Sequence, residues 1–141
     1  MIPNAGSYIN KGYNPVCFAD EVDNNIRDEI VALFEKVGKV PVVKENQLEG
    51  YAMISAMGHT YFWFQLKHLR DLALQFGIPG EDADESIYHM VQGTIDTLFK
   101  SGLTYDQVID LIPVKPMAES EKYIMDTFSE KLNSVYNKIK A

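Results

Sequence analysis

The chain has 141 residues, of which 46% are hydrophobic and 23% charged, which is the composition of one ordinary globular domain. Thirteen lysines and arginines against twenty aspartates and glutamates give a net charge of -7, which opposes binding to nucleic acid or to an anionic membrane surface. The single cysteine excludes an intrachain disulfide, and no apolar run reaches the roughly 20 residues of a membrane-spanning helix. We therefore expect a cytoplasmic protein without nucleic-acid or membrane partners.

Residues 1–45 predict a strand, a helix and a second strand. Glycines and prolines are spread through the first fifteen residues and argue against a helix there, whereas Val16–Ala19 is apolar and predicts a short strand. Asp20 is the expected N-cap of an amphipathic helix that stops at Gly38. Lys39–Val43 is rich in valine but contains Pro41, so it predicts an edge strand.

Residues 46–141 predict a bundle of helices. Apolar residues recur there at three-to-four spacing, and Thr104–Gln107 has the form of a capping box. The expected helices run from Asn46 to Phe76 without a break, through Ile87 to Leu98 before Ser101–Gly102, from Thr104 to Ile112, and from Glu119 to Lys140. The prediction is a mainly α chain of about five helices with two short N-terminal strands, forming a single domain over residues 1–141.

Nucleotide and metal sites are disfavoured by the motifs. The sequence has neither a Gly-x-Gly-x-x-Gly run after a strand nor a Gly-Lys-Ser/Thr loop, so the chain alone is not expected to bind a dinucleotide. His59, His68 and His89 are too scattered to form a pair of metal ligands, and no metal site is predicted. Cys17 lies in an apolar run, which favours a small buried hydrophobe over a nucleophile.

The most unusual local chemistry lies at Ser55–Tyr61, Ser-Ala-Met-Gly-His-Thr-Tyr, inside the long predicted helix. A glycine within a helix costs about 1 kcal/mol relative to alanine, so we expect a close approach by another group. In one interpretation a crossing helix packs against the small residues. In the other, Ser55, His59 and Tyr61 present hydroxyl and imidazole groups beside a gap that holds a small ligand.

Two further features have two interpretations each. The loop 113–119 precedes a helix whose N-terminal N–H groups could hold a carboxylate with help from Lys115; alternatively it is a plain connection with Lys115 in solvent. The long helix carries apolar side chains around more than one face, which favours burial by a second subunit in an isologous dimer. Burial inside a monomeric bundle is the alternative.

Short motifs follow one another in a set order along the chain. They are Met1-Ile2-Pro3-Asn4, the residues Ser55, Gly58 and Tyr61, then Gly77-Ile78-Pro79, Val91-Gln92-Gly93 and Ser101-Gly102. In order and spacing they resemble motifs in the C-terminal dimerisation domain of the pyrroline-5-carboxylate reductase family, and the resemblance spans nearly all 141 residues.

The resemblance implies the helical fold of a C-terminal dimerisation domain of the 6-phosphogluconate dehydrogenase type. It also implies an oxidoreductase of proline biosynthesis that reduces a C=N bond of a small cyclic imino acid with NADPH or NADH. In that family the cofactor is held by an N-terminal Rossmann domain, so we expect this chain to be part of a longer protein and to bind no cofactor alone. The implied assembly is a homodimer or a higher oligomer.

The resemblance also suggests site residues. It places Ser55, Gly58 and Tyr61 in the substrate pocket and Asn4 near the nicotinamide. Lys115 is a candidate for the substrate carboxylate. His59 is a candidate proton donor on its chemistry, since it is not a residue of the family motif.

One stretch departs from the family pattern. Val114–Glu119 aligns with a Ser-Pro-Gly-Gly-Thr-Thr segment of the active site and has neither the glycine pair nor the threonines. Ala118 cannot donate a hydroxyl proton, and Glu119 would repel a carboxylate substrate. The alternatives are therefore a diverged substrate, a non-catalytic dimeric scaffold or regulatory relative, or an unrelated helical adaptor that binds an amphipathic helix.

Overall fold

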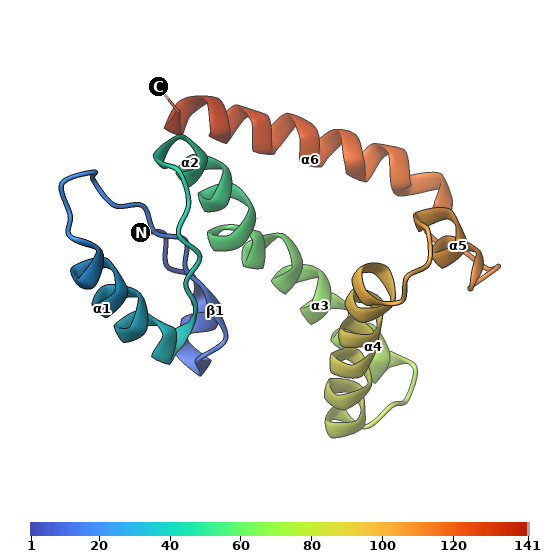
Figure 1. Cartoon of the computed structure of the whole chain (residues 1–141). Coiled ribbons are helices and arrows are strands. Elements are labelled where there is room, and N and C mark those ends of the chain that lie inside the picture. The colour runs from blue at the N-terminus through green and yellow to red at the C-terminus, as the bar shows by residue number, and fades with distance from the viewer. Residues whose placement is uncertain (141) are drawn as a thin grey trace. The chain divides into compact units, whose positions relative to one another are not determined.

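The computed structural model describes residues 1–140, and Figure 1 shows their elements in chain order. The chain divides into two compact units, which are described separately below. The first unit comprises Met1–Phe62 and the residues from Thr127 onward; the second is Trp63–Asp126. The long helices α3 (Gly58–Gln75) and α6 (Ala118–Ile139) each contribute to both units. The prediction of a mainly helical chain with two short strands is confirmed.

The first unit begins with a short 3-10 helix, Ala5–Ile9, and two parallel strands. Strand β1 (Gly12–Tyr13) pairs with β2 (Gly38–Lys39), and Val16 forms a further parallel bridge with Val42. The pairing therefore starts earlier than the predicted strand Val16–Ala19, of which only Val16 is paired. Gly12 lies opposite Gly38, whose φ is 140°, and a Cβ on Gly38 would overlap the backbone of Gly12. Two glycines are required because the backbones approach so closely.

Helix α1 (Asn24–Phe34) connects the strands and starts later than expected. The predicted N-cap Asp20 is wrong, since Asp23 caps the helix by accepting from the N–H of Asn25 at 2.8 Å. The guanidinium of Arg27 donates to the carbonyl oxygens of Ala19, Asp20 and Val22 and holds this segment in a turn. Because a side chain donates to those carbonyls, they do not need the backbone N–H donors that a helix would supply, and the helix can start after them.

The expected helix from Asn46 to Phe76 is not one regular α-helix. It begins with a 3-10 turn, Glu45–Gln47, continues as α2 (Leu48–Tyr51), passes through a π-helical turn at Ala52–Ala56, and resumes as α3. Met53 in the π turn is 4% exposed, whereas Phe76, directly after the end of α3, is 76% exposed.

The second unit contains most of α3, helix α4 (Gly80–Lys100), helix α5 (Tyr105–Asp110) and the start of α6. Gly77, with a φ of 87°, ends α3 as expected. The predicted capping box is confirmed at α5, where Thr104 accepts from the N–H of Gln107 and the Gln107 side chain accepts from the N–H of Thr104. Arg70 of α3 forms an ion pair with Asp84 of α4.

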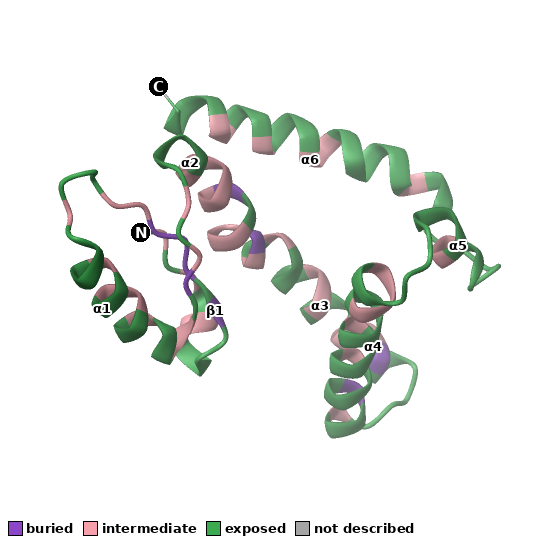
Figure 2. Cartoon of the chain, viewed as in Figure 1, coloured by how far each residue is buried: buried purple, intermediate pink, exposed green. Residues whose placement is uncertain are grey.

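Little of the described chain is fully buried, as Figure 2 shows. In the first unit, the buried residues gather at the paired strands, including Asn14, Val16 and Val40, and at Met53. In the second unit, the buried hydrophobic residues among those described are Ala73 and Ala83. No helix among residues 1–140 is long and apolar enough to cross a membrane.

Candidate functional site

The Ser55–Tyr61 segment, which is unusual in sequence, begins inside the π-helical turn and includes its last two residues, Ser55 and Ala56. In a π turn an N–H group bonds to the carbonyl five residues back, as the N–H of Met57 does to the oxygen of Ala52 at 2.9 Å. The hydroxyl of Ser55 donates to the carbonyl of Tyr51 at 2.8 Å. Such turns occur often at functional sites, so the irregularity coincides with the predicted pocket residues.

The side chain of Tyr61 reaches back over the π turn. Its hydroxyl donates to the carbonyl oxygen of Met53 at 2.6 Å. Its ring packs edge-to-face on Phe128 of α6, with ring centroids 5.8 Å apart and planes at 84°. Burial raises the pKa of the Tyr61 phenol above its ordinary value. The hydroxyl is thus protonated at neutral pH, and it donates its hydrogen bond to a group of the same chain, the carbonyl of Met53.

Gly58 and His59 form the first turn of α3. Gly58 is buried and His59 half-buried. A Cβ added at Gly58 would have Tyr61 Cε2 as its nearest neighbour, at 4.0 Å, which is an ordinary contact. Within residues 1–140 an alanine would therefore fit, so the close approach predicted at Gly58 is not made by the described chain.

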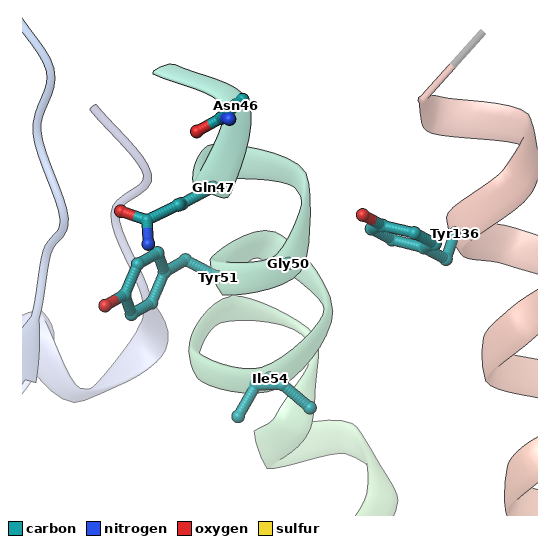
Figure 3. A pocket seen from close by; sticks show the side chains of 6 residues that line it. All are labelled: Asn46, Gln47, Gly50, Tyr51, Ile54 and Tyr136. Atoms are coloured by element: carbon teal, nitrogen blue, oxygen red, sulfur yellow. The ribbon is translucent and has the colours of Figure 1, made fainter. Parts of the chain in front are cut away.

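An open hollow of about 430 Å³ lies in the first unit and was not found from the sequence. Figure 3 shows Tyr136 of α6 facing the helix that carries Gly50 and Ile54. The lining residues are Asn46, Gln47, Gly50, Tyr51, Ile54 and Tyr136. Gly50 was the available signal, because it is a second glycine within a predicted helix. An added Cβ there would meet no atom of residues 1–140 within 4 Å.

Asn4, the predicted nicotinamide contact, caps the first 3-10 helix. Its side-chain oxygen accepts from the N–H of Gly6 at 2.9 Å, and its amide nitrogen donates to the carbonyl of Tyr13, also at 2.9 Å. Its own N–H donates to the side-chain oxygen of Asn14, which is 1% exposed. Both polar atoms of the Asn4 side chain therefore serve the local fold, and a cofactor contact at this residue stays a prediction.

Lys115 lies in the second unit, whereas Ser55, Gly58, His59 and Tyr61 lie in the first. Its Nζ is 4.0 Å from a carboxylate oxygen of Asp110, and the whole stretch 110–119 is exposed. The following helix carries Glu119 and Glu121 in its first turn, where carboxylates are favourable. Its N-terminus thus has negative charge of its own.

Two findings bear on other kinds of site. Among the described residues, no group of three or more histidine, cysteine, aspartate or glutamate side chains could hold a metal ion. In the second unit a smaller hollow of about 150 Å³ is lined by Leu66 of α3 and by residues of α4. Its lining is mostly apolar.

No protein-family model matches the chain. Among curated proteins, the pyrroline-5-carboxylate reductase of Staphylococcus aureus strain COL is 23% identical over 108 residues, which cover 77% of this chain and 40% of that protein. The pyrroline-5-carboxylate reductase of Mycobacterium tuberculosis is 26% identical over 99 residues, covering 70% of this chain and 34% of that protein. This chain thus spans less than half the length of either relative.

Solved structures agree with these relatives. The 1-pyrroline-5-carboxylate reductase of Streptococcus pyogenes matches 98% of this chain and 56% of its own, with a TM-score of 0.80 and 18% identity. The Plasmodium falciparum pyrroline carboxylate reductase, solved with NADP bound, matches 98% of this chain and 58% of its own, with a TM-score of 0.76 and 18% identity. In sequence and in fold, the chain is therefore similar to pyrroline-5-carboxylate reductases.

Proposed function

We propose that these residues form the dimerisation and substrate-pocket domain of an NAD(P)H-dependent reductase that reduces the C=N bond of a small cyclic imino acid. The observation that carries the proposal is that sequence relatives and structural neighbours point to the same enzyme. The cofactor would be held mainly by residues outside this chain, since the chain has no glycine-rich phosphate loop.

In this proposal the π turn and the start of α3 face the substrate. Ser55, Gly58 and Tyr61 line the pocket, and the backbone at Gly58 allows a close approach because no side chain stands there. His59 delivers a proton to the imine nitrogen as hydride reaches the carbon of the C=N bond.

The test is turnover by the complete product of the reading frame that encodes these residues. We expect oxidation of NADPH or NADH that depends on pyrroline-5-carboxylate or another cyclic imine, and a loss of at least tenfold in kcat/KM for Ser55→Ala. The matched control is Ser129→Ala, an exposed serine on α6, which should leave turnover unchanged. Absence of turnover with every imine and both cofactors would refute the enzymatic function.

We also propose that the functional form is a homodimer. In the second unit, large apolar side chains on α3 and α4 find no cover from their own unit; Phe64 is 67% and Phe99 75% exposed. Exposed apolar surface of this extent is typical of an interface. Gly93, in the middle of α4, supports this because an added Cβ would meet no atom of residues 1–140 within 4 Å. A helical glycine with open space beside it permits a close approach by a second copy.

Light scattering after size-exclusion chromatography tests the assembly. We expect a mass of twice the 16.0 kDa of the chain, reduced to the monomer mass in Phe99→Lys. Tyr8→Lys is the control, since Tyr8 is also exposed but belongs to the first unit. A monomer at all concentrations would refute the dimer.

A second candidate function is a non-catalytic dimeric scaffold. The start of α6 favours it, because Glu119 and Glu121 occupy the first turn where the resemblance places hydroxyl groups around a substrate carboxylate. A dimer that neither binds nor oxidises NADPH as the complete protein would support the scaffold. Turnover abolished by Ser55→Ala would exclude it.

A further inference from the structure

The π turn gives the helix one residue more than a regular α-helix would hold. About 3.6 residues make one α-helical turn, so each residue rotates the chain by about 100° about the axis. A turn with hydrogen bonds to the fifth residue back absorbs one additional residue in a single turn. The segments before and after Ala52–Ala56 therefore keep the relative orientation that they would have without the additional residue. In a regular α-helix of the same sequence, the segment after the turn would be rotated about the helix axis by about 100° relative to the segment before it, compared with the observed arrangement.

Two aromatic contacts in the first unit fix these orientations. Before the turn, the ring of Tyr51 lies 6.2 Å from that of Tyr13 next to the paired strands. After the turn, the ring of Tyr61 packs on Phe128 of α6. A regular α-helix between them would break one contact or the other. The additional residue is thus accommodated by the π turn because both ends of the segment are held by side chains.

Hydrogen bonds from side chains then compensate the irregular backbone. The turn replaces the regular ladder over several residues, which leaves carbonyl groups in need of other donors. The hydroxyl of Ser55 donates to the carbonyl of Tyr51, and that of Tyr61 to the carbonyl of Met53. Met53 is buried, so its carbonyl has poor access to water. Losing this donor costs more than losing an exposed one.

We propose that Tyr61 is a positioning residue, whose hydroxyl holds the π turn through Met53 and so determines which side chains of residues 52–58 face the pocket. The proposal assigns Tyr61 a role through the backbone beyond that of a pocket-lining group. The consequence for the pocket rests on the proposed function, whereas the effect on the turn does not. The turn itself can be tested in the chain of 141 residues.

Hydrogen exchange of the backbone amides is the test, with Tyr61→Phe as the main variant. This change removes only the hydroxyl and keeps the ring on Phe128, so the chain is expected to fold. We expect the amides of Met53–Gly58 to exchange at least tenfold faster, with those of α1 changed less than twofold. The control is Tyr51→Phe, because the Tyr51 ring packs on Tyr13 and no hydrogen bond of its hydroxyl to residues 1–140 is observed. It should leave the turn unchanged.

Deletion of Ala56 supplies a second, independent variant. It removes the additional residue, so a regular α-helix can then keep both aromatic contacts. In that background, Tyr61→Phe should accelerate exchange at residues 53–58 by less than twofold, because no π turn remains to be held. An effect as large as in the chain that retains Ala56 would show that the hydroxyl stabilises the helix in general, and it would overturn the proposal.

Two other results would also overturn it. One is unchanged exchange at Met53–Gly58 in Tyr61→Phe; the other is an equal acceleration of α1 and the turn, which would indicate a loss of global stability only. Failure of the proposed function can be told apart from failure of this proposal, because turnover and hydrogen exchange are measured separately. If the complete protein has no turnover but exchange changes as expected, Tyr61 holds the turn and the enzymatic proposal alone fails.

Discussion

Replacing Gly58 with alanine tests whether this glycine serves the chain itself or a molecule outside it. Gly58 has helical backbone in α3, and an added Cβ would make one contact, at 4.0 Å from Tyr61 Cε2. Alanine is favoured over glycine within a helix by about 1 kcal/mol. With no clash to subtract, we expect the free energy of unfolding of the chain to rise by about 0.5–1 kcal/mol. For a chain of this size, 1 kcal/mol corresponds to roughly 3–5 °C in Tm.

Urea unfolding followed by circular dichroism measures this change at low and high protein concentration. Gly50→Ala is the matched control, since it is another helical glycine of the first unit whose added Cβ would meet no described atom within 4 Å; it should gain a similar amount. A loss of 1 kcal/mol or more in Gly58→Ala alone would refute the reasoning, because it would mean that the space is filled. In the complete protein, Gly58→Ala is expected to raise KM for the imine.

Three further predictions concern the first unit. Gly38→Ala should lower the free energy of unfolding in urea by more than about 2 kcal/mol, because it adds strain at a φ of 140° and overlap with the Gly12 backbone; an unchanged urea midpoint would contradict the paired-strand geometry. Arg27→Lys should cost about 1–2 kcal/mol, since lysine cannot serve the carbonyls of Ala19, Asp20 and Val22 together, and proteolysis within residues 19–23 should become faster; equal cleavage rates would contradict this role. Burial raises the pKa of Tyr61, so the unfolded state ionises first as pH rises above about 10. The stability advantage of wild type over Tyr61→Phe should be constant below that pH and decrease above it, as measured by urea unfolding, and an advantage that grew with pH would contradict the assigned burial.

Much of the helical fold follows from local sequence signals. The stops at Gly77 and Ser101–Gly102 and the capping box at Thr104 depend on neighbouring residues, and the structure confirms them. The start of α1 was wrong by a few residues because two aspartates, at positions 20 and 23, are both acceptable caps. Arg27 favours the later start, because its guanidinium donates to carbonyl oxygens of the residues before Asp23. A hydrogen bond from a side chain to these carbonyls leaves no periodic pattern in the sequence from which it could be predicted.

The candidate site shows the same division between local and tertiary causes. The small residues and glycine of Ser55–Tyr61 are unusual within an apolar helix, and the end of the π turn lies among them; that they line a substrate pocket stays a prediction. No pattern indicated the π turn, since it depends on Tyr51 meeting Tyr13 and Tyr61 meeting Phe128. The hollow at Gly50 was also missed, because Tyr136 reaches it from a helix about 80 residues further along the chain.

The sequence alone determined the mainly helical composition, the two short strands, the places where helices stop, and the similarity to reductase motifs. These properties arise from neighbouring residues, through backbone propensity, capping and hydrophobic periodicity. Only the tertiary structure decided the register of the helix between Asn46 and Phe76 and the groups to which Ser55, Tyr61 and Asn4 donate. Those outcomes depend on contacts between residues far apart in the chain, and a change of one residue in helical phase, about 100°, is enough to redirect every side chain of a site.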